Sequence, residues 1–119
     1  MSITRIDVTS GPGPRMSRCV IKGDMVYLSG LVSRDRDTDV KGQTQDILDQ
    51  IDAYLEKAGT NKSNLIQANL WITDMSNFSA MNEIWNAWVD PENPPVRACV
   101  RADLASPALL VEIMVTCAK

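Results

Sequence analysis

Histidine is absent from this 119-residue sequence, which removes several classes of catalytic and metal site at once. Without it, neither a Ser-His-Asp triad, a Cys-His pair nor a histidine-containing zinc site can form. Cysteine is scarce as well: Cys19, Cys99 and Cys117 have no Cys-x-x-Cys spacing, which predicts free thiols and argues against a disulfide framework or a thiolate metal site. Any general base must therefore be Asp, Glu, Lys, Tyr, Cys or a held water, and we expect no metal and no organic cofactor.

Long apolar runs are also missing. No stretch of about 18 apolar residues could cross a membrane, and the N-terminal segment MSITRIDVTSGPGPR has no apolar signal core, so we expect a cytoplasmic protein. The net charge of −3 and the pI near 4.8 argue against nucleic acid as the main partner. With 45% hydrophobic and 23% charged residues the chain can fill a core, and its length suits one domain over residues 1–119.

The apolar pattern predicts six strands and two helices. Apolar side chains recur at helical spacing over residues 47–58, which predicts a helix. A polar loop is expected before it, over residues 34–42. Gly59 follows it and can adopt the left-handed conformation that often ends a helix. A second helix is expected after Ser76 as its N-cap. Strands are expected at residues 3–8, 19–21, 25–29, 65–73, 96–101 and 108–117. This order fits an α+β sandwich: a mixed six-stranded sheet with two helices packed on one face, and a second face that needs a partner subunit.

The stretch PPVRACVRADLASPALLVEIMVTC is where we expect the chemistry. Two strands joined by a short polar loop at residues 103–107 predict a hairpin. Glu112 stands inside an almost continuous apolar run, where a carboxylate is costly to desolvate unless a cation or hydrogen-bond donors meet it. Arg97 and Arg101 are the nearest candidate cations. The sequence leaves open which of them faces Glu112, because it does not fix the register.

Several segments together resemble the reactive intermediate deaminase family (RidA, formerly YjgF). They are VYLSGLVS, LEKAGTNKSNLIQANLWITDMSNFSAMNEIWNAWV and PPVRACVRADLASPALLVEIMV, so the similarity covers the chain from Val20 onward. The combination of P-x-R-x-C with x-x-E-I in the last strand is specific. The resemblance implies a chorismate-mutase-like fold and a homotrimer with a site in each of three clefts between subunits. It also implies hydrolysis of 2-imino and 2-enamino acids, released by pyridoxal-phosphate-dependent dehydratases, to 2-oxo acids and ammonia.

The same resemblance implies roles for particular residues. Glu112 matches the glutamate that positions water, and Arg97 matches the arginine that binds the substrate carboxylate. The family's other substrate-binding positions are matched by Cys99, Ser29, Gly30 and Asn82.

The N-terminal region departs from the family pattern. Members of the main branch have a tyrosine after Gly-Pro that closes the site, whereas this chain has Arg15 and Met16 there. The chain therefore resembles a side branch. Arg15 could replace the tyrosine as a second contact for an anion, although loop arginines after Gly-Pro are usually just solvated.

The matched residues also have structural interpretations. Arg97 could be a solvated residue at a strand edge, and Glu112 could belong to an ion pair at a subunit contact. Cys99 fits a small buried apolar side chain better than a nucleophile, because no base stands beside it. Ser29 could cap a turn, and Asn82 could bond to backbone within its own subunit.

The leading hypothesis is an imine deaminase. In it, Arg97 anchors the carboxylate of a small metabolite through two parallel hydrogen bonds, and Glu112 accepts a proton from water. The alternative is a binding or regulatory module of the same fold, which holds a small carboxylate such as a 2-oxo acid without turnover. A ribonuclease is disfavoured by the acidic pI.

Overall fold

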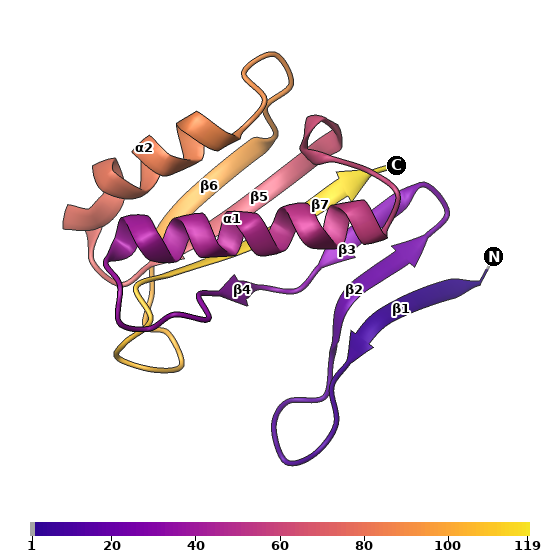
Figure 1. Ribbon diagram of the computed structural model, residues 1–119, viewed down its shortest axis with the longest axis horizontal. Helices are drawn as coiled ribbons and strands as arrows, with labels where there is room; N and C mark the ends of the chain where they lie inside the picture. Colours follow the sequence, from indigo (N-terminus) through magenta and orange to yellow (C-terminus); the bar gives the residue numbers. More distant parts are fainter. Residues whose placement is uncertain (1) are drawn as a thin grey trace.

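The computed structural model describes residues 2–119, in which two helices pack on one face of a seven-stranded sheet (Figure 1). The elements in chain order are β1 (Ile3–Val8), β2 (Ser17–Lys22), β3 (Met25–Leu28), β4 (Leu31–Val32), α1 (Val40–Lys57), β5 (Leu65–Ile72), α2 (Phe78–Trp88), β6 (Val96–Arg101) and β7 (Val111–Ala118). Short 3-10 turns, η1 (Lys62–Asn64) and η2 (Met75–Asn77), precede β5 and α2. The expected α+β arrangement is confirmed.

The sheet is mixed. Its strands run in the order β1-β2-β3-β7-β5-β6, and the two-residue strand β4 also pairs with β7. β5 and β6 are parallel and are joined by α2, whereas all other pairs are antiparallel. The sheet has one strand more than expected, because the strand predicted over residues 25–29 ends at Leu28 and the chain rejoins β7 as β4.

The predicted hairpin between the last two strands is wrong. β5 lies between β6 and β7, so Leu70 pairs with Cys99 on one side and with Ile113 on the other. The connection is longer than the predicted turn because β7 begins only at Val111. Gln43 of α1 holds the end of this connection: its amide nitrogen donates to the carbonyl of residue 108 at 2.9 Å, and its oxygen accepts from the backbone N–H of residue 110 at 2.9 Å.

This topology decides which residues flank Glu112. Its cross-strand neighbours are Trp71 of β5 and Val32 of β4. Arg97 and Arg101 lie on β6, beyond β5, about two strand spacings or 10 Å away. Neither arginine is therefore the cross-strand partner of Glu112.

The core lies between the sheet and the helices. Alternate residues of β7 point toward the helices, and residues one helical turn apart on α1 and α2 point back. The main buried side chains are Val111, Ile113, Val115 and Cys117 of β7, Ile47, Leu48, Ile51 and Leu55 of α1, and Met81, Trp85 and Trp88 of α2.

The other face of the sheet, which we call the open face, is not covered by any helix among residues 2–119. It carries Tyr27, Val96, Val100 and Met114, whose side chains are 43%, 69%, 49% and 42% exposed. Each of these alternates along its strand with a residue that faces the helices. The helices thus cover only one face, as the sequence indicated.

The helix ends differ in detail from the predictions. α1 begins inside the loop expected over 34–42, because the Asp39 carboxylate caps it by accepting from the Gly42 N–H at 2.9 Å. Ser76 does not cap the second helix. Instead, Asp74 accepts from the Ser76 N–H at 2.9 Å and starts η2, which leads into α2. Neither helix within residues 2–119 has the length and apolarity needed to span a bilayer.

Candidate active site

An irregular step in the sheet positions Ser29 and Gly30. Tyr27 of β3 lies opposite Thr116, whereas Leu31 of β4 lies opposite Ile113. The β3–β4 side therefore has one more residue than β7 over this interval, as in a β-bulge, and such bulges redirect side chains. The Ser29 N–H donates to the carbonyl oxygen of residue 18 at 2.9 Å, which holds the bulge against β2.

Glu112 packs directly on this bulge. It lies between Val111 and Ile113, which are fully buried beneath the helices, so its own side chain projects from the open face. A Cβ atom added to Gly30 would collide with the Glu112 carboxylate, which shows how closely the two residues approach. We call Ser29, Gly30 and Glu112 the glutamate cluster.

The Glu112 carboxyl group is electrostatically unusual. Its side chain is half-buried, and this desolvation raises the pKa of Glu112 above its ordinary value. Within residues 2–119, no hydrogen bond or ion pair reaches its carboxylate. A carboxyl group with a raised pKa is a stronger base than an exposed one and can accept a proton more readily.

A hollow of about 360 Å³ opens next to the glutamate cluster. Its lining consists of Met16, Ser17, Val20, Tyr27, Leu28, Ser29, Gly30 and Met114. The hydroxyl oxygen of Ser29 is buried and has no hydrogen-bond partner among the described residues, although such atoms are normally satisfied. Arg15 is exposed and does not line this hollow, whereas its neighbour Met16 does.

A second group of residues surrounds Arg97. The guanidinium carbon of Arg97 lies 5.5 Å from the ring centre of Trp85 and 5.9 Å from that of Phe78, both on α2. These cation–π contacts hold the half-buried side chain against the helix-covered face of the sheet. In residues 2–119, neither of the two ion pairs involves Arg97. Its charge is therefore available to an anion.

Asn82 belongs to the same group. It lies four residues after Phe78 and three before Trp85, so all three share one face of α2. The side-chain oxygen of Asn82 is buried and has no partner within the part of the chain that the structure describes. Cys99, two residues past Arg97, packs at the edge of the core. We call Arg97, Asn82, Cys99 and the two aromatic rings the arginine cluster.

The Cys99 thiol is poorly suited to act as a nucleophile. Burial raises its pKa, and the nearby Arg97 charge only partly opposes that effect. Because the thiolate is the reactive form, this environment keeps Cys99 unreactive.

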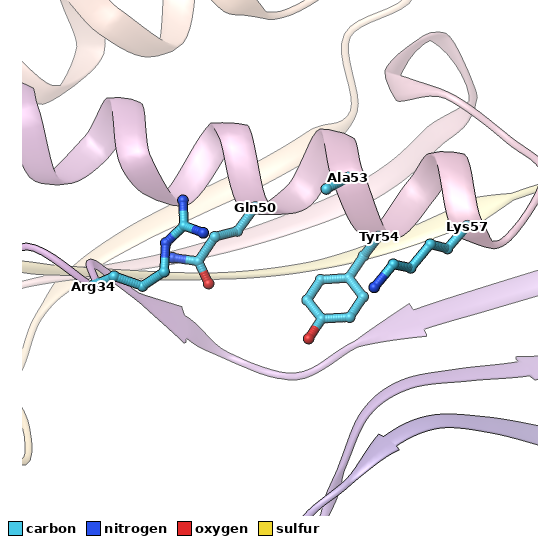
Figure 2. Close-up of a pocket in the computed structure, with 5 residues that line it drawn as sticks. All are labelled: Arg34, Gln50, Ala53, Tyr54 and Lys57. Atoms are coloured by element: carbon cyan, nitrogen blue, oxygen red, sulfur yellow. The ribbon is translucent and has the colours of Figure 1, made fainter.

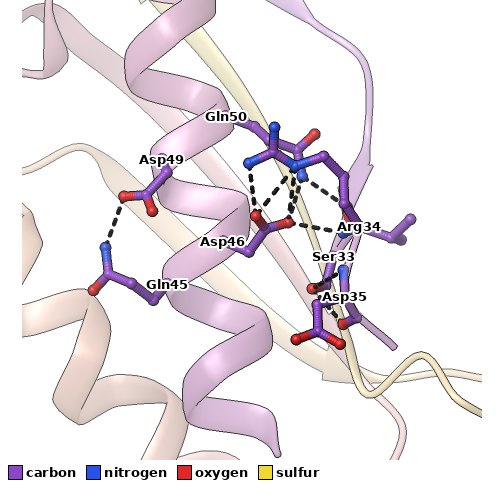
Figure 3. A network of polar contacts seen from close by, with 8 residues as sticks. Ser33, Arg34, Asp35, Gln45, Asp46, Asp49 and Gln50 are labelled. Carbon is purple, nitrogen blue, oxygen red and sulfur yellow. Dashed lines mark hydrogen bonds and ion pairs between the residues drawn. The ribbon is translucent and has the colours of Figure 1, made fainter. Parts of the chain in front are cut away.

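Other polar features lie elsewhere. A hollow of about 220 Å³ beside α1 is lined by Arg34, Gln50, Ala53, Tyr54 and Lys57 (Figure 2), none of which was a predicted site residue. Arg34 is held by Asp46 at 2.7 Å within a network that includes Gln50 (Figure 3). This ion pair lowers the pKa of Asp46. Because Asp46 already neutralises the Arg34 guanidinium, the pair has a structural role, and the hollow is a poor site for an anion.

The structure thus divides the predicted site residues into two clusters. Ser29, Gly30 and Glu112 meet at the open face. Arg97 and Cys99 lie on the opposite face, at the sheet edge formed by β6, where α2 carries Asn82 between the two rings that contact Arg97. Within one protomer, the structure does not bring the two clusters together.

Several neighbouring residues were not identified from the sequence as part of the site. Trp85 belongs to the buried core, and its ring also supports Arg97. The spacing of Phe78, Asn82 and Trp85 on one helix face was the available signal. Among residues 2–119, no three Cys, Asp or Glu side chains are grouped closely enough to hold a metal ion.

Known proteins match the chain over almost its whole length. The family model described as Endoribonuclease L-PSP matches residues 11–119. The RutC family protein YoaB of Escherichia coli strain K12 is 42% identical over 118 residues, or 99% of each chain. A RutC family protein of Haemophilus ducreyi is 41% identical over 116 residues, which are 98% of this chain and 96% of the relative.

Solved structures agree with these matches. A YjgF family protein from Neisseria meningitidis is 38% identical, with a TM-score of 0.92, over 100% of this chain and 96% of that one. A Rid family protein from Yersinia pestis is 28% identical, with a TM-score of 0.85, over 99% and 100% of the two chains. The chain therefore belongs to the YjgF/RidA family and has its α+β, chorismate-mutase-like fold.

Proposed function

We propose that the protein is a cytoplasmic homotrimer that hydrolyses 2-imino and 2-enamino acids to 2-oxo acids and ammonia in clefts between its subunits. The observation that carries this proposal is the division of the site. The arginine and glutamate clusters lie on opposite faces of one sheet, and each contains a buried polar atom without a partner among residues 2–119. A buried polar atom without a hydrogen bond destabilises the fold unless a ligand or another subunit supplies the partner.

The arginine cluster suits the carboxylate end of the substrate. The Arg97 guanidinium lies over two aromatic rings, and it can offer two parallel N–H groups to a carboxylate. The unpartnered oxygen of Asn82 can accept a hydrogen bond from an iminium N–H. Both contacts orient the substrate without any covalent step.

The glutamate cluster suits the water molecule. Glu112 can accept one proton while the water oxygen attacks the imine carbon, and it can return that proton to the departing nitrogen. The resulting carbinolamine then gives its hydroxyl proton to the Glu112 carboxylate as the C–N bond breaks, so that a C=O bond forms and ammonia leaves. Because an iminium carbon is already electrophilic, positioning of the reactants supplies most of the required rate gain.

A second copy of the chain is the simplest way to unite the clusters. A small metabolite cannot reach across the sheet of one protomer, but the open face of one copy can meet the β6 edge of another. The exposed apolar side chains of the open face support such a contact. Three copies in a closed ring would form three equivalent clefts, as the family resemblance implies.

An imine-trapping assay tests this proposal. An amino-acid oxidase generates the imine, and semicarbazide traps whatever has not been hydrolysed. We expect the protein to accelerate imine loss, Arg97→Ala to abolish the effect, and Arg101→Ala, an exposed arginine on the same strand, to retain it. No acceleration by the wild type, or equal acceleration by Arg97→Ala, overturns the proposal.

A binding module is the second candidate, and Met16 favours it. Met16 lines the hollow next to Ser29 and occupies the region where the main branch of the family has its closing tyrosine. In this case the site holds a 2-oxo acid without turnover. Calorimetric binding of 2-oxobutanoate that disappears in Arg97→Ala, together with no effect on imine loss, would favour the module.

Ribonuclease activity appears in the description of the family model. The net charge of −3 offers little attraction for a phosphate backbone. RNA cleavage that persists through further purification, and that another residue is shown to carry, would be needed to support it.

A further inference from the structure

A larger hollow of about 370 Å³ adjoins the one beside α1 that Figure 2 shows. The two hollows share Arg34, Gln50 and Tyr54. The larger one is also lined by Arg18, Leu31, Val32, Ser33 and Arg36, and we call it the triple-arginine hollow. Three arginines line it and no Asp or Glu does, although the whole chain carries a net charge of −3.

Two of these arginines have no acidic partner. Among residues 2–119, ion pairs join Arg34 to Asp46 and Lys41 to Glu83, so neither Arg18 nor Arg36 takes part in one. Like charges around one hollow repel each other, and an anion bound between them removes that repulsion. The smaller hollow has one arginine, which its acidic partner neutralises, so only the larger hollow suits an anion.

Two acids close to the lining residues are already engaged. Asp46 contacts Arg34 through Nε and Nη2, which leaves Nη1 without a hydrogen bond within residues 2–119. Asp7 accepts from the Tyr54 hydroxyl at 2.6 Å. Burial and this hydrogen bond raise the pKa of Tyr54 to about 12, so its hydroxyl stays neutral and does not repel an anion.

The loop that carries Arg34 and Arg36 is held by its own hydrogen bonds (Figure 3). The buried Ser33 hydroxyl donates to the carbonyl oxygen of Asp35 at 2.7 Å and accepts from the Asp35 N–H at 3.2 Å. The Arg34 N–H donates to the Asp46 carboxylate at 2.8 Å. A site whose backbone is fixed before the ligand arrives loses less conformational entropy on binding.

We propose that the triple-arginine hollow binds a small phosphoryl anion, either free phosphate or a phosphate monoester. Guanidinium groups present several N–H donors in a fork that matches phosphate oxygens. The two positive charges without an acidic partner match the charge of about −1.5 to −2 that a phosphate monoester carries at neutral pH. The volume lies near the lower end of the roughly 300–1,000 Å³ typical of small-molecule sites. This inference does not depend on the proposed deaminase.

Calorimetry with inorganic phosphate tests the proposal. The full-length wild type and Arg97→Ala are both titrated at low ionic strength, because the charge of Arg97 is also available to an anion. We expect saturable binding of one phosphate per chain that persists in Arg97→Ala. Arg18→Gln and Arg36→Gln should each weaken it by about tenfold or more, the loss expected for a hydrogen bond to a charged group. Arg101→Gln changes an exposed arginine of β6, at the edge of the sheet, and should leave it unchanged.

Three results would overturn the proposal. One is the lack of saturable binding at millimolar phosphate. Another is binding that Arg97→Ala abolishes, which would place the anion in the arginine cluster. The third is equal weakening by Arg101→Gln and Arg36→Gln, which would reflect net charge alone. Arg36 is exposed, so Arg36→Gln should keep the fold, and thermal unfolding without phosphate checks this.

Two further ligands identify the anion. Glycerol 3-phosphate that binds more tightly than inorganic phosphate supports a phosphate monoester, and the reverse order supports free phosphate. Succinate, titrated into Arg97→Ala, should bind more weakly than either, because its two charges lie at opposite ends of the molecule. Equal binding of succinate and phosphate would overturn the assignment to a phosphoryl group.

Discussion

Arg97 and Glu112 lie on opposite faces of the same sheet. Arg97 packs on the rings of α2, on the helix-covered side, and Glu112 projects from the open face beside Gly30. β5 separates their strands. Any reaction that uses both residues on one small substrate therefore requires two protomers.

Mixed oligomers should recover activity that neither parent variant has. We expect Arg97→Ala and Glu112→Gln to be inactive alone. In a mixed trimer, one cleft receives Arg97 from one subunit and Glu112 from its neighbour. Random mixing by co-expression or by joint refolding should restore about a quarter of wild-type activity.

Two measurements accompany this experiment. Light scattering after size-exclusion chromatography should give the mass of a trimer for each sample. The two variants mixed without subunit exchange should remain inactive. Absence of recovery in verified mixed trimers would place both residues in one protomer's site, or would remove one of them from catalysis.

The shape of the Arg97 head group should matter as well as its charge. Arg97→Ala should lower the affinity for 2-oxobutanoate by about 10- to 150-fold, the range for hydrogen bonds to charged groups. The affinity of Arg97→Lys should fall between those of the wild type and Arg97→Ala. Lysine keeps the positive charge but lacks the planar fork that lies over Phe78 and Trp85. Calorimetry measures the affinity of both variants for 2-oxobutanoate. Full affinity in Arg97→Lys would mean that the site uses the positive charge alone.

The contribution of Glu112 to the free energy of unfolding should decrease as pH rises. Burial raises its pKa in the folded state, so the folded protein binds this proton more tightly than the unfolded chain does. The contribution of Glu112 to the free energy of unfolding is therefore complete below the ordinary pKa of a glutamate. It is lost as pH rises through the raised folded-state pKa.

The variant Glu112→Gln removes this titration. Its free energy of unfolding, measured in urea and compared with that of the wild type, should increase with pH across this window. Its activity should fall by about 10²- to 10⁴-fold. Glu56→Gln changes an exposed glutamate of α1 and should show neither effect. A stability difference that does not vary with pH would show that the carboxyl group titrates alike in both states.

Gly30 should be required for the position of Glu112. A Cβ at residue 30 would collide with the Glu112 carboxylate, so Gly30→Ala must displace that side chain. We expect kcat to fall at least about tenfold, with little loss of stability, because the clash is with the flexible end of the Glu112 side chain, which can move aside. In Gly13→Ala the new methyl group meets no atom within 4 Å, and both quantities should be nearly unchanged. Full activity in Gly30→Ala would mean that the close packing of Glu112 is incidental.

Local patterns in the sequence predicted the elements but not how distant strands pair. β1 has the predicted bounds of residues 3–8, and Gly59 adopts the left-handed φ of +83° that a helix stop favours. The pairing of β5 with both β6 and β7 depends on contacts between segments far apart in the chain, and periodicity carries no information about them. The hairpin was predicted because adjacent strands most often pair.

In the sequence, Val96 and Val100 alternate with Arg97, Cys99 and Arg101, as in a strand, but this alternation does not reveal which side of β6 faces the core. Val96 and Val100 point to the open face, and Arg97 and Cys99 point toward α2. An apolar row usually faces the core, so the burial rule alone assigns the wrong side. The two aromatic rings reach Arg97 only because α2 packs on β6, and no local sequence pattern specifies this packing.

The indole ring of Trp85 lies 5.5 Å from the guanidinium carbon of Arg97. Indole emission responds to the local electric field, so an anion that docks on this guanidinium should shift the fluorescence of Trp85. The protein therefore carries its own optical probe of site occupancy, one that needs no label and no turnover.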